Sequence, residues 1–304
     1  MSNSIPWVEK YRPDNFDKII LSDENKFFFN QIFKKDIFPN LILYGPPGTG
    51  KTTTIINIIK KYQKLNNQID NSLIMHLNAS DDRGIDIIRN NISTFVNSKH
   101  LFTKGLKFII LDEVDYMTKN AQQALKFLIQ TNAENVRYCL ICNYISKIDL
   151  SLLMEFILIR FNDLPKNIII EFLKSIVENE KLSLTNKDIE NIQKIYKSDI
   201  RSMINYIQNN CNNKKLETIN DNILEKIFIL HINNDFNKFN KIIINYGSQL
   251  LIDNKIIIKN YINYLIIEKC DFLTIENILE LKCIYNNIYN KYNLYYLFYL
   301  LSKK

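Results

Sequence analysis

Apolar residues follow two different patterns along the chain, and the change between them comes near residue 165. Before that point, short apolar runs alternate with longer amphipathic stretches, and the runs read NLILYG, SLIMHLN, KFIILDE, VRYCLICN and FILIRF. Continuous apolar runs of this length are typical of strands buried on both faces. Their alternation with helix-length segments indicates an α/β domain, so we predict a mainly parallel sheet built from these five runs.

After Pro165, the last proline, apolar residues are spaced as they are in helices. Segments such as EFLKSIVENEKL and IIIKNYINYLIIEK repeat apolar positions every three or four residues, with almost no glycine or proline between them. This pattern predicts an all-helical second part of the chain. With the polar stretch NNKKLETINDN as a second boundary, it predicts three domains that span residues 1–163, 164–222 and 223–304.

Composition adds only broad limits to this picture. A chain of 304 residues with 46% hydrophobic and 23% charged residues has the profile of a globular protein with more than one domain. The formal net charge of +7 permits a polyanionic partner, although a modest basic excess is also typical of an ordinary solvated surface. Neither the N-terminus nor the apolar stretch LYYLFYLL resembles a signal peptide or a membrane span, so we expect a soluble intracellular protein.

The cysteines do not predict a disulfide framework or a metal centre. Cys139 and Cys142 are spaced C-x-x-C, but they lie inside the strand-like run VRYCLICN and no second pair follows. A zinc site needs four ligands, usually in two such pairs. We therefore interpret these two thiols as part of the core.

A glycine-rich loop, GPPGTGKT, joins the first predicted strand to a helix. The pattern G-x-x-x-x-G-K-T in this context is typical of a phosphate-binding P-loop. Its glycines let backbone N–H groups approach phosphate oxygens, Lys51 reaches the β- and γ-phosphates, and the Thr52 hydroxyl ligates Mg²⁺. The predicted nucleotide contacts are Gly45, Pro46, Pro47, Gly48, Thr49, Gly50, Lys51, Thr52 and Thr53. The alternative is a glycine-rich turn that holds no ligand.

Polar residues end the third and fourth predicted strands. Asp112 and Glu113 close KFIILDE, at the carboxyl edge of the sheet, where nucleotides bind in open α/β folds. We predict that Asp112 holds the magnesium and that Glu113 orients or activates the attacking water, although acids after a strand also commonly cap a helix. Asn143 ends the next strand and could hydrogen-bond the γ-phosphate. An asparagine at the end of a strand serves just as often only to form the following turn.

Five sequence motifs occur along the chain in this order: PWVEKYRP, LYGPPGTGKTT, LNASDDRGID, ILDEVDYMTKNAQQAL and SDIRSMINYIQ. Together they resemble the small subunits of the replication factor C clamp loader, within the AAA+ ATPases, over about residues 5 to 210. The resemblance implies an AAA+ P-loop domain followed by a small helical lid and an all-helical collar through which five subunits assemble. It also implies a ring that uses ATP and Mg²⁺ to open a sliding clamp and to place it on primer-template DNA.

The resemblance also implies roles for residues outside the P-loop. Val8, Tyr11 and Arg12 match a segment that lies near the adenine. Asn143 matches the sensor of the γ-phosphate. Arg201, in SDIRSM, matches a second sensor that reaches the nucleotide from the lid, although the sequence alone also allows an ordinary surface arginine.

Candidate DNA contacts come from the same resemblance. The apolar positions of IDIIRNNISTFV mark one helix face and leave Arg89 on the other, and the matching helix in the family lines the central channel. Arg83, Arg89 and Lys119 are therefore candidate phosphate contacts, which give affinity without sequence readout. A solvated helix face is the alternative. By the same resemblance, Asn78 could couple the arrival of DNA to Glu113.

Two further positions concern partners. Phe102 and Leu106 are possible anchors for the clamp, since they lie in the stretch that contacts it in similar proteins. In the family, a helix after the strand of Asn143 ends in Ser-Arg-Cys, whose arginine reaches the neighbouring subunit's ATP site. Aligned through Asn143 and the RF at 160–161, those three positions fall on Met154–Phe156, so Glu155 stands where the arginine is expected.

The sequence thus favours an ATP-binding clamp-loader subunit whose own P-loop is intact but which lacks the arginine for its neighbour. Two alternatives stay open. One is a structural subunit of the ring that binds nucleotide with little hydrolysis, and the other is a different AAA+ ATPase that remodels DNA.

Overall fold

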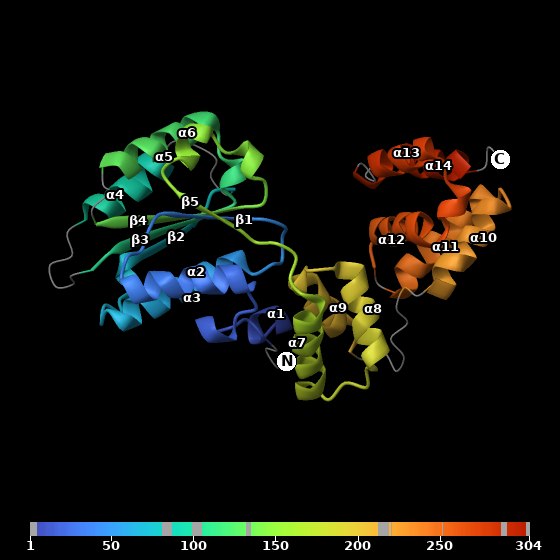
Figure 1. Cartoon of the computed structure of the whole chain (residues 1–304), viewed down its shortest axis with the longest axis horizontal. Helices are drawn as coiled ribbons and strands as arrows, with labels where there is room; N and C mark the ends of the chain where they lie inside the picture. Colours follow the sequence, from blue (N-terminus) through green and yellow to red (C-terminus); the bar gives the residue numbers. More distant parts are fainter. Residues whose placement is uncertain are drawn as a thin grey trace. The chain divides into compact units, whose positions relative to one another are not determined.

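The computed structural model describes residues 5–80, 87–98, 105–131, 135–211, 219, 221–250, 252–286 and 291–301. The chain divides into two compact units (Figure 1). The first unit comprises residues 1–169 with 198–202, and the second comprises residues 170–197 with 203–304. In the part of the chain described, no helix has both the length and the apolar character required to cross a membrane.

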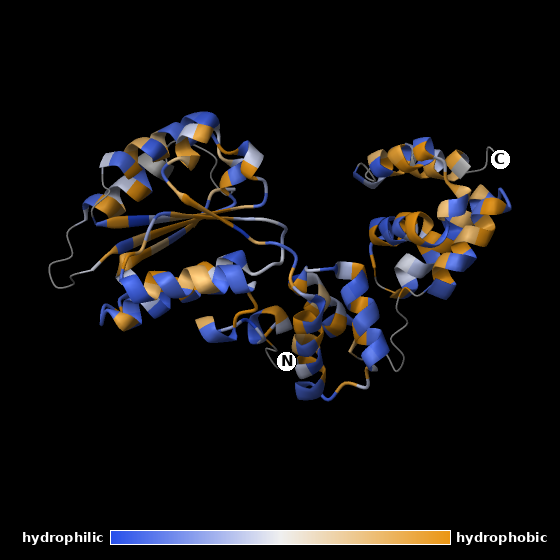
Figure 2. Cartoon of the chain, viewed as in Figure 1, coloured by the Kyte–Doolittle hydropathy of each residue, from blue (hydrophilic) through white to orange (hydrophobic). Residues whose placement is uncertain are grey.

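The first unit contains a parallel sheet of five strands in the order β2-β3-β4-β1-β5. The strands are β1 Leu41–Tyr44, β2 Ile74–Asn78, β3 Lys107–Asp112, β4 Val136–Cys142 and β5 Ile157–Arg160. Each one falls in an apolar run from which a strand was predicted, so the predicted α/β fold class is confirmed. The runs are apolar because the central strands are covered on both faces, which leaves no position for a solvated side chain. Figure 2 shows this as hydrophobic colouring along the strands.

Helices cover the two faces of the sheet (Figure 1). The helices α2 Asp23–Lys35 and α3 Lys51–Leu65 lie on one face, and α4 Ser93–Asn97, α5 Lys119–Thr131 and α6 Leu150–Leu153 lie on the other. Side chains of β1 alternate between them: Leu41 and Leu43 pack with the α2 and α3 core, whereas Ile42 packs with α5 and α6. This two-residue period sends neighbouring side chains of a strand into different cores.

The two thiols of the C-x-x-C pattern obey the same rule. Both lie in β4, and Cys139 belongs to the core under α2 and α3 while Cys142 belongs to the core under α5 and α6. Burial raises the pKa of Cys142 to about 12, so the thiolate that a metal requires is strongly disfavoured. The spacing therefore reflects two independent core positions.

The described residues after Pro165 are helical or lie in short connections, as predicted. The helices are α7 Lys166–Asn179, α8 Asn186–Tyr196, α9 Ile200–Asn210, α10 Asp221–Ile232, α11 Phe236–Leu250, α12 Asn254–Glu268, α13 Ile275–Asn286 and α14 Lys291–Leu301. Local signals start some of them; α8, for example, begins with a capping box between Thr185 and Asp188. The division at residues 164 and 222 into lid and collar stays a prediction.

A buried histidine joins three helices of the second unit. His231 of α10 lies within hydrogen-bonding distance of the Tyr261 hydroxyl of α12 (2.7 Å) and of the Phe298 carbonyl of α14 (2.8 Å). Its ring also stacks on that of Phe298 at a centroid distance of 5.2 Å. Burial lowers the pKa of His231, because the imidazolium form loses hydration in this apolar core.

Candidate functional site

The P-loop connects the end of β1 at Tyr44 to the start of α3 at Lys51. Gly45 has a φ of +146°, and a Cβ there would lie 2.2 Å from the carbonyl oxygen of Phe161. Gly48 has a φ of +73°, and a Cβ there would lie 1.9 Å from a carboxylate oxygen of Asp199. Both positions therefore require glycine for conformation and for space. The loop opens at the carboxyl edge of the sheet, where the sequence placed it.

The side chain of Lys51 lies in the middle of this loop, and the residue is 7% exposed. Its ammonium donates to the carbonyls of Gly45 and Pro46, both at 2.8 Å, and to Oδ1 of Asn143 at 3.0 Å. Burial lowers the pKa of Lys51, and the nearby Asp112 carboxylate opposes this shift. The structure thus brings together Lys51 and Asn143, which lie 92 positions apart in the sequence.

Thr52 and Asp112 form the second polar pair of the site. The Thr52 hydroxyl donates to Oδ2 of Asp112 at 2.7 Å, and Oδ1 of Asp112 accepts from the backbone N–H of Glu113 at 2.9 Å. Glu113 follows in a left-handed conformation, with a φ of +57°. This left-handed residue lies directly after the end of β3 at Asp112.

The oxygen atoms of Thr52 and Asp112 fit Mg²⁺ rather than a metal held by the protein alone. Magnesium in proteins is commonly bound by one or two oxygen side chains, with nucleotide phosphates and water completing the octahedron. Within the described ranges, no group of three or more histidine, cysteine, aspartate or glutamate side chains could hold a metal ion. A metal at this position would therefore depend on the nucleotide for most of its ligands.

Asp115 lies next to this pair and was not predicted from the sequence. It is 5% exposed, and both its carboxylate oxygens are buried without a hydrogen bond from any described group. Its charge acts on Lys51 and on the thiol of Cys142, raising the pKa of both. A buried carboxylate without a donor is costly, so the favourable field of Lys51 contributes to its placement here.

Arg201 approaches the P-loop from the first turn of α9. It is exposed, and its positive charge contributes to lowering the pKa of Lys51. Asp199 precedes the helix and caps it, accepting from the N–H of Ser202 at 3.1 Å and from its hydroxyl at 2.8 Å. The Asp199 carboxylate is the group that lies against Gly48. An acid directly before a predicted helix indicates an N-cap, so the capping role of Asp199 could have been predicted from the sequence. Its proximity to the P-loop could not.

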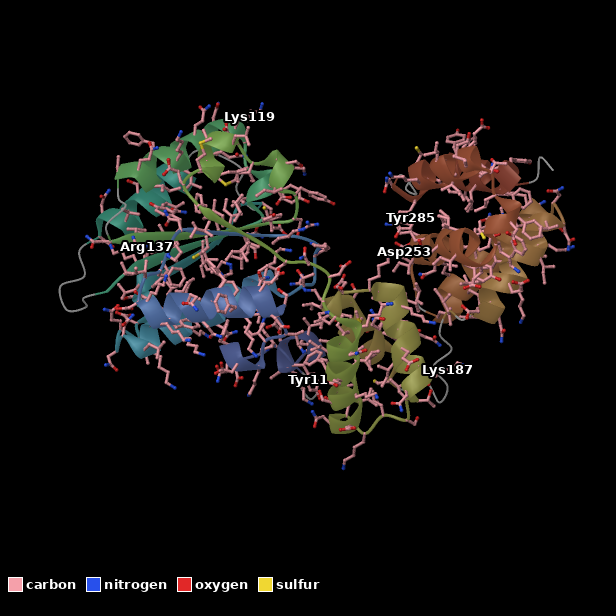
Figure 3. All side chains as sticks on the ribbon, viewed as in Figure 1. Tyr11, Lys119, Arg137, Lys187, Asp253 and Tyr285 are labelled. Atoms are coloured by element: carbon pink, nitrogen blue, oxygen red, sulfur yellow. The ribbon has the colours of Figure 1, made fainter. Side chains whose placement is uncertain are left out.

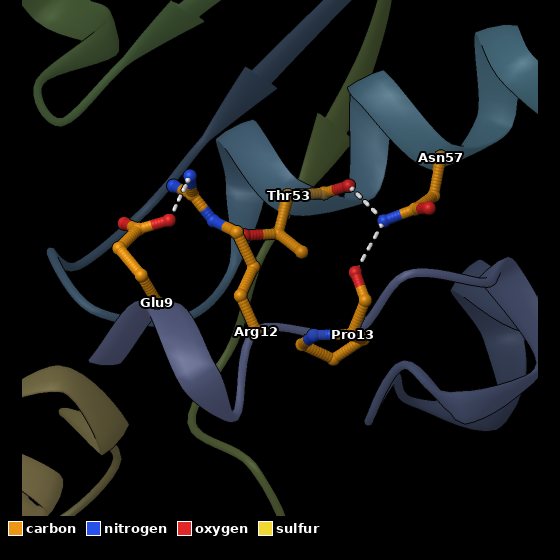
Figure 4. Close-up of polar contacts among 5 residues, drawn as sticks. All are labelled: Glu9, Arg12, Pro13, Thr53 and Asn57. Atoms are coloured by element: carbon orange, nitrogen blue, oxygen red, sulfur yellow. Dashed lines mark hydrogen bonds and ion pairs between the residues drawn. The ribbon is translucent and has the colours of Figure 1, made fainter. Parts of the chain in front are cut away.

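The N-terminal segment contacts the first turns of α3 (Figure 4). Nε of Arg12 donates to the Thr53 hydroxyl at 3.3 Å, and Nη1 of Arg12 pairs with Glu9 at 3.0 Å. Val8 lies in α1 Trp7–Lys10 and Tyr11 follows it; both are half-buried. The guanidinium of Arg12 therefore lies beside the start of α3, while the predicted adenine contacts of all three residues stay predictions.

The predicted DNA contacts are only partly described. Arg83 lies outside the described residues, and the side chain of Arg89 is also outside them, although its backbone belongs to the helical turn Ile87–Ile92. Lys119 is exposed at the start of α5, on the outer surface of its helical layer (Figure 3). Asn78 ends β2 opposite Asp112 in the register, and its Oδ1 accepts from the N–H and the hydroxyl of Ser80.

The two candidate clamp anchors have different outcomes. Phe102 lies outside the described residues. Leu106 is half-buried and packs against the core under α2 and α3, where it supports the sheet. A contact of either residue with a clamp stays a prediction.

Glu155 lies between the end of α6 and the start of the edge strand β5. It is half-buried, and its Oε1 accepts a hydrogen bond of 2.7 Å from Nε2 of Gln130 in α5. Met154 beside it is 85% exposed and Leu150, at the start of α6, is 74% exposed. The acid is therefore held by a neutral amide at an apolar surface.

Comparisons with known proteins agree with this geometry. Residues 41–163 match the model of the ATPase family associated with various cellular activities (AAA). The chain is 40% identical over 205 residues to replication factor C subunit 5 of Homo sapiens, which covers 67% of this chain and 60% of that protein. It is 37% identical over 205 residues to replication factor C subunit 3 of Saccharomyces cerevisiae, covering 67% of this chain and 59% of that protein.

An archaeal relative gives a similar result. The chain is 38% identical over 202 residues to replication factor C small subunit 2 of Pyrobaculum islandicum, covering 66% of this chain and 62% of that protein. The chain thus spans about 60% of the length of the relatives that it matches. The resemblance predicted from the sequence motifs is confirmed.

Proposed function

Because the chain carries an AAA ATPase domain and is homologous to replication factor C subunits, we propose that it binds ATP as a small subunit of a clamp loader. Such an assembly loads a sliding clamp onto primer-template DNA, with other subunits of the same kind as partners. ATP and Mg²⁺ are the proposed cofactors.

The observation that carries this proposal is the polar network at the carboxyl edge of the sheet. Lys51, from the P-loop, is bonded to Asn143 at the end of β4, and Thr52 is bonded to Asp112 at the end of β3. The Lys51 ammonium and the side-chain oxygens of Thr52 and Asp112 therefore lie together at the positive N-terminal end of α3. This combination suits a triphosphate with its magnesium. A turn without a ligand would have no need to bury a lysine at this position.

Each residue then has a separate part in the reaction. Lys51 holds the β- and γ-phosphates, while Thr52 and Asp112 hold the magnesium, which neutralises charge on the phosphates when bound. Glu113 orients the attacking water and accepts its proton. Asn143 contacts the γ-phosphate from the sheet, and Arg201 contacts the nucleotide from α9.

The surface around Glu155 has a different part in this proposal. An arginine at this position would stabilise charge on the phosphate that is transferred in a neighbouring subunit. Glu155 has the opposite charge, and Gln130 holds it in place. We therefore propose that this chain does not activate its neighbour, and that hydrolysis at its own P-loop requires an arginine from a different subunit.

The DNA contacts are proposed at Arg83, Arg89 and Lys119. These side chains would bind phosphates of the DNA backbone and give a salt-dependent affinity without sequence preference. The affinity of the assembled complex for primed DNA should fall when Lys119 is replaced by glutamine. The slope of the logarithm of this affinity against the logarithm of the salt concentration should decrease by about one.

The test compares the isolated chain with the assembled complex. We expect the isolated chain to bind ATP and to hydrolyse it very slowly, and turnover to rise in the complex with clamp and primed DNA. Glu113→Gln in the complex should then abolish the contribution of this site while ATP remains bound. Fast hydrolysis by the isolated chain would contradict the proposal, and unchanged turnover after Glu113→Gln would favour a structural subunit that binds nucleotide without using it.

A further inference from the structure

One face of α3 carries three polar side chains that hold the N-terminal segment. Thr53, Asn57 and Lys61 are spaced four residues apart, so they form a single row along the helix. Each contacts a different part of the segment before α2: Arg12, the carbonyl of Pro13, and Asp17. We call this row the α3 clip.

Asn57 is the central contact of the clip. It is 4% exposed, and its Nδ2 donates to the carbonyl of Thr53 and to the carbonyl of Pro13, both at 2.9 Å (Figure 4). Its helical neighbours Ile55 and Ile58 are fully buried and apolar. Asparagine is a poorer helix former than leucine, so the helix alone gives no reason for an amide at this position. The contact with Pro13 supplies the reason.

Lys61 provides the contact farthest from the P-loop. Its ammonium pairs with Asp17 at 2.9 Å and lies over the rings of Phe16 and Phe33, 4.8 and 5.0 Å from their centroids. Because the Lys61 side chain is 27% exposed, the charge remains in contact with water. This contact therefore stabilises the segment less than the buried amide of Asn57 does.

Thr53 connects the clip to the nucleotide site. It follows Thr52 in the first turn of α3, where the positive end of the helix faces the P-loop. Arg12 reaches Thr53 with a side chain that is 36% exposed, and it shares its charge with Glu9. An anion bound at the start of α3 would attract this guanidinium directly.

From this arrangement we propose that Asn57 is a positioning residue for nucleotide binding. It holds the segment 7–13 on α3, so that Arg12 adds its charge to the phosphate site. Docking of the segment strengthens nucleotide binding, and bound nucleotide strengthens docking by the same factor, because the coupling between two such events is reciprocal. The inference rests on the proposed binding of nucleotide at the P-loop.

The chain contains its own reporter for docking of the segment. Trp7 is the only tryptophan in the sequence, and it begins α1 within the segment. We expect Asn57→Leu, without nucleotide, to shift the emission of Trp7 to longer wavelength and to increase its quenching by acrylamide. The matched control is Gln63→Leu, because Gln63 is also buried in α3 and donates to a backbone carbonyl, that of Asp70.

The second measurement is the affinity for Mg·ADP and Mg·ATP by calorimetry on the full chain. Asn57→Leu should weaken both affinities about tenfold, because the segment loses its buried hydrogen bond from Asn57 to the Pro13 carbonyl. Gln63→Leu should leave both affinities unchanged. Saturating nucleotide should restore part of the protection of Trp7 in the Asn57 variant. Lys61→Met, which leaves the core intact, should give the same changes with a smaller size.

The outcomes separate this inference from the proposed function. If no variant or native chain binds nucleotide, the proposed function fails. If the native chain binds nucleotide, and Asn57→Leu and Lys61→Met change neither its affinity nor the quenching of Trp7, the inference is overturned. Increased quenching with unchanged affinity would also overturn it, because docking would then be structural only.

Discussion

Two buried lysines lie at opposite edges of the same parallel sheet. Lys51 is at the carboxyl edge in the P-loop, and Lys107 begins β3 at the amino edge. Both are less than 10% exposed, both donate to backbone carbonyls, and burial lowers the pKa of each. Judged by burial and pKa alone, the two would be equally good candidates for a functional site.

Their neighbours are different. The ammonium of Lys107 donates to the carbonyls of Phe95, Val96 and Ser98 and to the Ser98 hydroxyl, so it satisfies the last carbonyls of α4. Lys51 also donates to a side chain, Asn143, and lies in the field of Asp112. The comparison teaches that a side-chain partner and nearby acids, rather than burial alone, distinguish the lysine of the proposed phosphate site.

The largest effect is expected from Lys51→Met. This change removes the charge that is proposed to bind the phosphates, so affinity for Mg·ATP should fall about 100-fold or more, as for the loss of a strong charge-assisted contact. Calorimetry on the isolated chain measures it. The free energy of unfolding should fall as well, because the change leaves the buried Asp115 carboxylate without the favourable field of Lys51. Retained affinity would remove the basis of the comparison.

A smaller effect is expected from Asp112→Asn. The amide keeps an oxygen for the Thr52 hydroxyl but lacks the charge that is proposed to hold magnesium, so the gain in ATP affinity on adding Mg²⁺ should shrink about tenfold. Titration of ATP with and without Mg²⁺ measures this gain. The equivalent change at Asp36, an exposed acid at the end of α2, is the control and should leave the gain unchanged. An equal loss without Mg²⁺ would assign Asp112 a role other than metal binding.

Lys107→Met tests the other edge of the sheet. Met keeps the apolar stem but removes the ammonium that donates to the carbonyls of Val96 and Ser98 at the end of α4, so the free energy of unfolding should fall by about 2 kcal/mol. Urea unfolding monitored by circular dichroism measures the loss. Nucleotide affinity should remain that of the native chain below the transition. Weaker ATP binding with unchanged stability would reverse the roles assigned to the two lysines.

The smallest effect is expected from His231. This residue is buried in the second unit, whereas both lysines belong to the first. Because its folded pKa is below the ordinary value of 6.5, the unfolded chain binds more protons in acid. Its contribution is therefore fully present above pH 6.5 and is lost as the pH falls below it, by at most about 1.4 kcal/mol per pH unit. Unfolding of the native chain and of His231→Gln between pH 7.5 and 5 measures the difference, and parallel pH profiles would show that His231 does not titrate.

Much of the first unit could be predicted because its signals are local. The central strands β1, β3 and β4 are almost wholly buried and must be apolar nearly throughout, so their runs were visible in the sequence, and the edge strands β2 and β5 also fall in apolar runs. The P-loop required glycines between a strand and a helix, and Asp112 followed a strand directly. The meeting of Lys51 with Asn143 then followed from the geometry of parallel strands, whose carboxyl ends share one edge.

The contacts that were missed depend on the packing of distant segments. Asn57 meets Pro13 across 44 positions, and nothing in TTTIINIIKK distinguishes that asparagine from a solvated one. Lys107 is the first residue of the apolar run KFIILDE, and its burial could not be predicted. Its acceptors are backbone carbonyls, which any sequence would provide. The burial of Asp115 depends on how the turn after β3 packs against β4, which no local pattern specifies.

The close approach of Asp199 to Gly48 has an evolutionary consequence. A side chain at position 48 would occupy the space of the carboxylate and would also be strained by the positive φ. Among relatives of this chain, position 48 should therefore remain glycine even where position 199 carries a different residue, so the two positions should not covary.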